Sequence, residues 1–269
     1  MLSRTVQSLV HRKMENFENK LWPLIYDQAN HGRHEQELSF YSAELSSCSG
    51  PILEVACGTG MILLPMFVKG LDIYGFDISL EMLDLLFAKA KNKGNLDIHE
   101  RVTQQNMVDF HYDKKFEAIF IPSRSFTHLL TQEEQIACLK NIHDHLQDGG
   151  RFLLNFSTPS LKALLRHAEP NQEFIPYGIF QHPDTREKIE VSFKQNNNLS
   201  EQIHYMTWRF SFGGEVRETK MRVRWIYKNE FQVLLRFTGF KISALYGDFH
   251  KSSYQGDGEM IWVLEKDST

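Results

Sequence analysis

The most informative stretch of this chain is Ile52 to Gly60, with the sequence Ile-Leu-Glu-Val-Ala-Cys-Gly-Thr-Gly. An apolar run that carries one acidic residue breaks into two glycines, and the chain continues with the apolar segment Met61 to Leu64. This order predicts a buried strand, a tight turn and the start of a helix. Gly58 and Gly60 allow backbone conformations that other residues rarely adopt, and they let a ligand come close to the main chain. We therefore expect a nucleotide-like ligand at this turn.

An acidic residue follows where a second strand would end. The apolar segment Leu71 to Phe76 leads into Asp77, which lies seventeen residues after Gly60. A carboxylate at a strand end can accept hydrogen bonds from both hydroxyl groups of a ribose. Because the carboxyl ends of parallel strands meet at one edge of a sheet, the two segments together predict a nucleoside site at that edge.

Two other phosphate-binding turns do not fit this stretch. The dinucleotide-binding fingerprint requires a third glycine three residues after the second, and position 63 is Leu. A Walker loop requires Gly-Lys followed by Ser or Thr, and no such sequence follows the turn. The stretch instead resembles motif I of the class I S-adenosylmethionine-dependent methyltransferases, E/D-x-G/A-x-G-x-G, with Glu54, Ala56, Gly58 and Gly60 on its positions. The resemblance implies S-adenosylmethionine as the cofactor, Glu54 as an orienting carboxylate and Asp77 as the ribose ligand.

The resemblance continues through the middle of the chain. Asn106 and Met107 look like the family's Gly-Asp-Met stretch, which we expect at the end of the fourth strand, beside the adenine. Asn106 replaces the usual Asp and keeps an oxygen that can accept a hydrogen bond. Ile78 is expected as an apolar wall for the adenine. Residues 119–130 resemble the segment that leaves the family's fourth strand, and the resemblance places Pro122 beside the cofactor.

The resemblance covers about Tyr26 to Lys266 and implies an α/β fold. We expect a Rossmann-like, seven-stranded, mostly parallel sheet with helices on both faces and an inserted antiparallel β-hairpin subdomain. The expected division is an N-terminal helical cap over 1–50, an S-adenosylmethionine-binding core over 51–157, a lid and antiparallel insertion over the acceptor pocket at 158–228, and the closing helix and last strand pair over 229–269.

Periodicity and capping residues predict the helices. Helix-like spacing over 4–20 and 34–47 flanks a separate aromatic segment at 22–27, which we expect to fold over the ligand. Ser79 can cap a helix that runs to about Asn92. Thr131 and Glu134 have the spacing of a capping box and predict the start of another helix.

Between Lys188 and Lys228 the apolar residues recur at every second position, as in strands. The three asparagines at 196–198 predict one turn. Gly213-Gly214 predicts a two-residue hairpin turn, and the resulting register pairs Met206 with Met221. We therefore expect an antiparallel insertion with one apolar face.

The catalytic candidates are few, because the sulfonium of S-adenosylmethionine is already an activated electrophile and the protein mainly has to align an acceptor and exclude water. His128 lies just past the predicted fourth strand, at the sheet edge where such folds place their active sites. A substrate contact and a packing role both fit His128. Tyr26 lies in the aromatic segment and can close the pocket against water. His128 and Tyr26 are the catalytic candidates.

Composition limits the partners and the setting. With 269 residues, of which 42% are hydrophobic, the chain can bury one substantial core. The net charge is −4 and the basic residues are scattered, which disfavours nucleic acid. The three cysteines have no metal-ligand spacing, and no apolar run is long enough to cross a membrane. We expect a cytoplasmic protein without a metal or a membrane partner, and a homodimer remains open.

The predicted function is methyl transfer from S-adenosylmethionine to an amine or hydroxyl group of a small polar metabolite, similar to the sugar-amine and glycine N-methyltransferases. The alternative is a regulatory or assembly protein that binds S-adenosylmethionine without catalysis. Motif I and Asp77 would look the same in both, so only turnover separates the two hypotheses.

Overall fold

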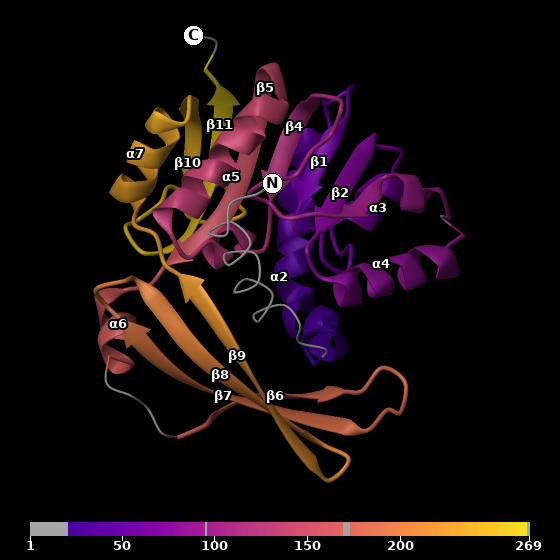
Figure 1. The fold of residues 1–269 in the computed structure, drawn as a ribbon, viewed down its shortest axis with the longest axis vertical. Coiled ribbons are helices and arrows are strands. Elements are labelled where there is room, and N and C mark those ends of the chain that lie inside the picture. Colours follow the sequence, from indigo (N-terminus) through magenta and orange to yellow (C-terminus); the bar gives the residue numbers. More distant parts are fainter. Residues whose placement is uncertain (1–20, 95, 169–172, 268–269) are drawn as a thin grey trace, which may run out of the picture.

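The computed structural model describes residues 21–94, 96–168 and 173–267, and it contains two sheets (Figure 1). The larger sheet has seven strands in the order β10-β11-β5-β4-β1-β2-β3. All of its pairings are parallel except those that β11 makes with β5 and β10, so the expected mostly parallel sheet is confirmed. Its strands are β1 (Ile52–Val55), β2 (Ile73–Asp77), β3 (Val102–Gln104), β4 (Phe116–Ile121), β5 (Leu146–Thr158), β10 (Phe240–Tyr246) and β11 (Gly258–Lys266).

Helices cover both faces of this sheet, as predicted. Apolar side chains of α5 and α7 pack on one face, and those of α2, α3 and α4 pack on the other (Figure 1). The described helices are α2 (Trp22–Leu45), α3 (Leu63–Val68), α4 (Leu80–Asn92), α5 (Gln132–His145), α6 (Leu161–Arg166) and α7 (Lys228–Phe237), with short 3-10 helices η1 (Leu96–Glu100) and η2 (Ser125–His128). None of these described helices is long and apolar enough to cross a membrane.

Both capping predictions are confirmed. The Ser79 hydroxyl accepts a hydrogen bond from the Met82 N–H at 3.3 Å, and α4 ends at Asn92. At the start of α5, Thr131 Oγ1 accepts from the Glu134 N–H at 3.2 Å, and Glu134 Oε2 accepts from the Thr131 N–H at 3.3 Å. Each cap satisfies backbone donors that the first helical turn leaves without a partner.

The prediction for the N-terminal segment is wrong over 22–33. Trp22–Leu45 is one continuous helix, so 22–27 is its first turns and not a separate segment. Pro23 is tolerated there because the first helical turn has no use for its missing N–H. Trp22 packs against a residue outside the helix, because its ring centroid lies 4.7 Å from that of Trp208. The helix predicted over 4–20 lies outside the described residues.

The second sheet is antiparallel and has the strand order β6-β7-β8-β9. The predicted register is confirmed: Met206 pairs with Met221, and Gly213 and Gly214 both have positive φ, as a two-residue turn requires. The insertion is larger than one hairpin, because two further strands extend it. Its strands are β6 (Ile175–Gln181), β7 (Lys188–Asn198), β8 (Ile203–Phe212) and β9 (Glu215–Arg224).

The turn predicted at 196–198 is wrong, because these asparagines continue β7 and the chain reverses after Asn198. Asn197 is buried and donates to the Leu164 carbonyl at 2.8 Å, so tertiary contacts hold it in the strand. Asn198 accepts hydrogen bonds from the backbone N–H groups of Ser200 and Glu201, and it therefore starts the turn instead of forming its centre.

Candidate active site

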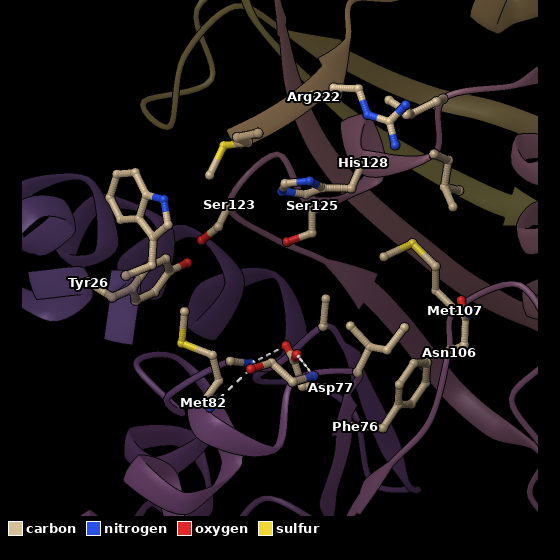
Figure 2. Close-up of a pocket in the computed structure, with 18 of the residues that line it drawn as sticks. Tyr26, Phe76, Asp77, Met82, Asn106, Met107, Ser123, Ser125, His128 and Arg222 are labelled. Atoms are coloured by element: carbon tan, nitrogen blue, oxygen red, sulfur yellow. Dashed lines mark hydrogen bonds between the residues drawn. The ribbon is translucent and has the colours of Figure 1, made fainter. Parts of the chain in front are cut away.

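A cavity of about 460 Å³ opens at the carboxyl edge of the large sheet, where α2 and the antiparallel sheet face that edge (Figure 2). The loops after β1, β2, β3 and β4 form one wall, and α2 with β6, β8 and β9 forms the other. The loop side includes Ala56, Gly58, Asp77, Ile78, Asn106, Met107, Ser123, Ser125 and His128, and the opposite side includes Trp22, Tyr26, Asn30, Arg33, Tyr177, Trp208, Met221 and Arg222.

The motif I turn brings main chain to the cavity. Ala56 has φ of 58° and Gly58 has φ of 52°, and both line the cavity. Gly60 does not line it and has a packing reason to be glycine: a Cβ there would lie 2.8 Å from Leu86 Cγ and 2.9 Å from Leu64 Cγ. Gly60 therefore supports the turn by letting α3 and α4 approach it closely.

Asp77 joins the ends of two strands. Its Oδ2 accepts from the Gly58 N–H at 2.8 Å, and its Oδ1 accepts from the Ser79 N–H at 2.8 Å. Burial raises the pKa of this carboxyl group, and these backbone donors oppose the rise. Each oxygen keeps further acceptor capacity, so Asp77 can still bind a pair of hydroxyl groups.

Glu54 lies behind the turn and does not line the cavity. Its side chain is 2% exposed, and its Oε2 makes no hydrogen bond with any described residue. Desolvation raises the pKa of Glu54 well above its ordinary value, and the charges of Glu37 and Asp77 add to the rise. A buried acceptor without a donor is costly. Glu54 is therefore prepared to receive a donor or a cation.

The adenine candidates require one correction. Asn106 and Met107 follow the third strand, not the fourth, because β3 ends at Gln104 and β4 begins only at Phe116. Both still line the cavity. Asn106 Oδ1 accepts from the Val108 N–H at 3.2 Å, so this oxygen already stabilises the local turn.

Of the two remaining cofactor candidates, one lines the cavity and the other does not. Ile78 lines the cavity, and its carbonyl accepts from Gln104 Nε2 at 3.0 Å. Pro122 is buried and does not line the cavity. Its carbonyl accepts from the N–H and the hydroxyl group of Ser125 at 3.1 and 2.9 Å, so it shapes the turn after β4.

Both catalytic candidates line the cavity. The Tyr26 hydroxyl points toward Ser123, and burial raises the pKa of Tyr26, so the phenol stays protonated (Figure 2). His128 ends η2, and burial lowers its pKa to about 4, so its imidazole is neutral at neutral pH. Within the described ranges, no group of His, Cys, Asp and Glu side chains is arranged to hold a metal ion.

Known methyltransferases resemble this chain in sequence. Residues 52–150 match the family model described as a methyltransferase domain. The putative methyltransferase YqeM of Bacillus subtilis is 28% identical over 250 residues, which cover 91% of this chain and 95% of that protein. A glycine/sarcosine N-methyltransferase of Aphanothece halophytica is 24% identical, over 88% of this chain and 84% of that protein.

A solved structure shares the fold. The CcbJ methyltransferase from Streptomyces caelestis has a TM-score of 0.73 at 20% sequence identity, covering 94% of this chain and 99% of that one. This chain is an S-adenosylmethionine-dependent methyltransferase. The site of the methyltransferase fits that cofactor, since the buried Glu54 oxygen lacks a donor among the described residues and Asp77 keeps acceptor capacity.

Several lining residues of the methyltransferase were not found from its sequence. Trp22, Asn30 and Arg33 lie on the same face of α2 as Tyr26, at spacings of three to four residues. That spacing was the available signal. The prediction of a separate segment at 22–27 divides this face, because Asn30 and Arg33 lie outside that segment. Ser123 and Arg222 carried no comparable local signal.

Proposed function

We propose that this methyltransferase transfers the methyl group to a nitrogen atom of a small polar amine. The supporting observation is the protonation state of the groups around the cavity. An alcohol acceptor needs a base that removes its proton, whereas a neutral amine already carries the attacking lone pair. The pKa of His128 is lowered to about 4, and that of Tyr26 is raised, so neither is a strong base at neutral pH.

The carboxylates that line the cavity already accept hydrogen bonds from the backbone, so we do not assign them the role of a base. Asp77 accepts from two backbone N–H groups, and Glu134 accepts from the N–H groups of Leu130 and Thr131 at the start of α5. The Arg222 guanidinium points into the acceptor side of the cavity (Figure 2). A nearby positive charge lowers the pKa of a bound amine and so favours its reactive neutral form.

We assign roles on this basis. S-adenosylmethionine supplies an electrophilic methyl group, and Glu54, Ala56, Gly58, Gly60, Asp77, Ile78, Asn106, Met107 and Pro122 form or support its binding side. Tyr26 and His128 hold the acceptor in line and exclude water. A neutral His128 adds no positive charge beside a sulfonium. The described residues of 1–50 and 158–228 would enclose the acceptor, and those of 51–157 and 229–269 would hold the cofactor. The name of the glycine/sarcosine N-methyltransferase relative agrees with an amine acceptor.

Methyl-labelled S-adenosylmethionine incubated with matched amines and alcohols of the same carbon skeleton tests this proposal. Labelled N-methyl products from amines alone would support it. Labelled ethers alone would contradict it. Cofactor binding without any labelled product would favour the non-catalytic alternative.

A further inference from the structure

Glu37 is a buried carboxylate that the assignments above do not use. It lies in the middle of α2 with 0% of its side chain exposed, and it does not line the cavity. Its Oε2 accepts from the Ser123 hydroxyl at 2.7 Å, and its Oε1 accepts from the Ser123 N–H at 3.1 Å. The Asn155 amide also donates to Oε1 at 3.1 Å, and Arg33 Nε lies 3.8 Å from it. Burial raises the pKa of Glu37, and the surrounding donors of Ser123, Arg33 and Asn155 oppose this rise and favour the charged form.

The bonds from Glu37 hold a strained turn. Ser123 and Arg124 follow β4 with φ of 58° and 63°, a left-handed conformation that is costly for residues other than glycine. Arg124 pairs with Glu259 at 2.5 Å, and Asn155 bridges Glu259 and Glu37. One network therefore holds both residues, and it presents Ser123 to the cavity.

This hydrogen-bond network determines whether the Ser123 hydroxyl group donates or accepts a hydrogen bond in the cavity. A hydroxyl group has one hydrogen, and an ionised carboxylate can only accept. Because the Ser123 hydrogen is committed to Glu37, the Ser123 oxygen presents only lone pairs to the cavity. The Tyr26 hydroxyl points at Ser123 and interacts with it (Figure 2). With that hydrogen committed to Glu37, any hydrogen bond between the two hydroxyl groups has Tyr26 as its donor, and the Tyr26 oxygen then also presents lone pairs.

We propose that Glu37 is a positioning residue that turns the Ser123–Tyr26 pair into an acceptor-only wall, which favours the cationic methyl donor over its neutral thioether product. This wall lies between Asp77, on the cofactor side, and Arg222, on the acceptor side (Figure 2). Lone pairs at that junction attract a sulfonium and its polarised methyl group, and they have no such attraction for a thioether. The proposal rests on the placement of the methyl group under the proposed function.

Calorimetry with S-adenosylmethionine and S-adenosylhomocysteine tests the proposal without a methyl acceptor. In Glu37→Gln, the amide keeps the volume but brings its own donors, so the Ser123 hydroxyl can turn into the cavity. We expect S-adenosylmethionine to bind about tenfold more weakly, and S-adenosylhomocysteine to change less than about twofold. Ser123→Ala should reduce the same preference for S-adenosylmethionine over S-adenosylhomocysteine, and it leaves the buried residues of α2 unchanged.

Glu44→Gln is the matched control, because Glu44 lies on the same helix and pairs with Arg151 and Lys251 away from the cavity. It should leave the ratio of the two affinities unchanged. If Glu37→Gln weakens the binding of both ligands equally, Glu37 has only a structural role, and the proposal is overturned. If Glu37→Gln does not fold, an unchanged ratio in Ser123→Ala overturns it. A changed ratio in an enzyme that methylates no amine would contradict the proposed function and leave this inference standing.

Discussion

The two walls of the cavity are built differently. On the loop wall, the motif I turn brings backbone to the cavity, held by positive φ at Ala56 and Gly58 and by the two hydrogen bonds of Asp77. The opposite wall presents long side chains from α2 and the antiparallel sheet, such as Trp208 and Arg222. Backbone recognition tolerates most substitutions, whereas a wall of side chains changes with each one. The acceptor side is therefore where substrate preference can change while cofactor binding is kept.

Trp208→Ala should have the largest effect, and it should show that the two walls act independently. The Trp208 ring packs against the rings of Trp22 and Phe193, with centroid distances of 4.7 and 5.0 Å. Its removal should lower the free energy of unfolding by about 3 kcal/mol. The folded fraction should still bind S-adenosylmethionine within about twofold of wild type. Thr207→Ala, on the opposite face of the same strand, is the control in denaturant titrations. A large loss of cofactor affinity in Trp208→Ala would mean that the walls are not independent.

His128→Ala should act on turnover and not on cofactor binding. We expect turnover to fall on the order of a hundredfold if His128 orients the acceptor. Because its pKa is lowered to about 4, the imidazole stays neutral as the pH rises from 5 to 9. The pH–rate profile of wild type should therefore rise with deprotonation of the amine and show no inflection near 6.5. An inflection that is present in wild type and lost in His128→Ala would identify the imidazole as a titrating base.

Asp77→Ala tests the loop wall directly. Asp77 is the side chain that holds the motif I turn and the start of α4 together. Its loss should weaken S-adenosylmethionine binding by about 1.5–3 kcal/mol, as for hydrogen bonds to a charged group. Asp84→Ala, at an exposed position of α4, should leave the affinity unchanged. Unchanged calorimetric affinity in Asp77→Ala would remove this residue from the site.

Glu54→Gln should have the smallest effect, with opposite signs for stability and binding. The folded pKa of Glu54 is raised above its ordinary value of 4.5, so its burial costs stability as the pH rises above 4.5. The neutral Gln should stabilise the cofactor-free protein by about 1 kcal/mol at pH 8. This gain should disappear below pH 4.5, where Glu54 is protonated in both states. Cofactor affinity should fall at the same time. A variant that is less stable than wild type at pH 8 would contradict this account.

Local features of the sequence predicted the loop wall. The strand, turn and helix around Gly58 form within a dozen residues, and the caps at Ser79 and Thr131 each involve neighbours three positions apart. The hairpin register followed from Gly213-Gly214 for the same reason, because two adjacent residues set the pairing of both strands. Asn106 was found as a cavity residue but assigned to the wrong strand, since β3 is only three residues long.

The motif I turn, the helix caps and the hairpin register could be predicted from the sequence because each depends on residues close together in the chain. The resemblance to the methyltransferase family indicated the fold class and the cofactor. Tertiary structure alone decided the acceptor wall. Glu37 and Ser123 lie 86 positions apart, and Trp22 meets Trp208 only after α2 has docked on the antiparallel sheet. Tertiary contacts also hold Asn197 in β7 against its preference for turns. The partners of these side chains depend on how whole elements pack, and neither periodicity nor spacing along the chain contains that information.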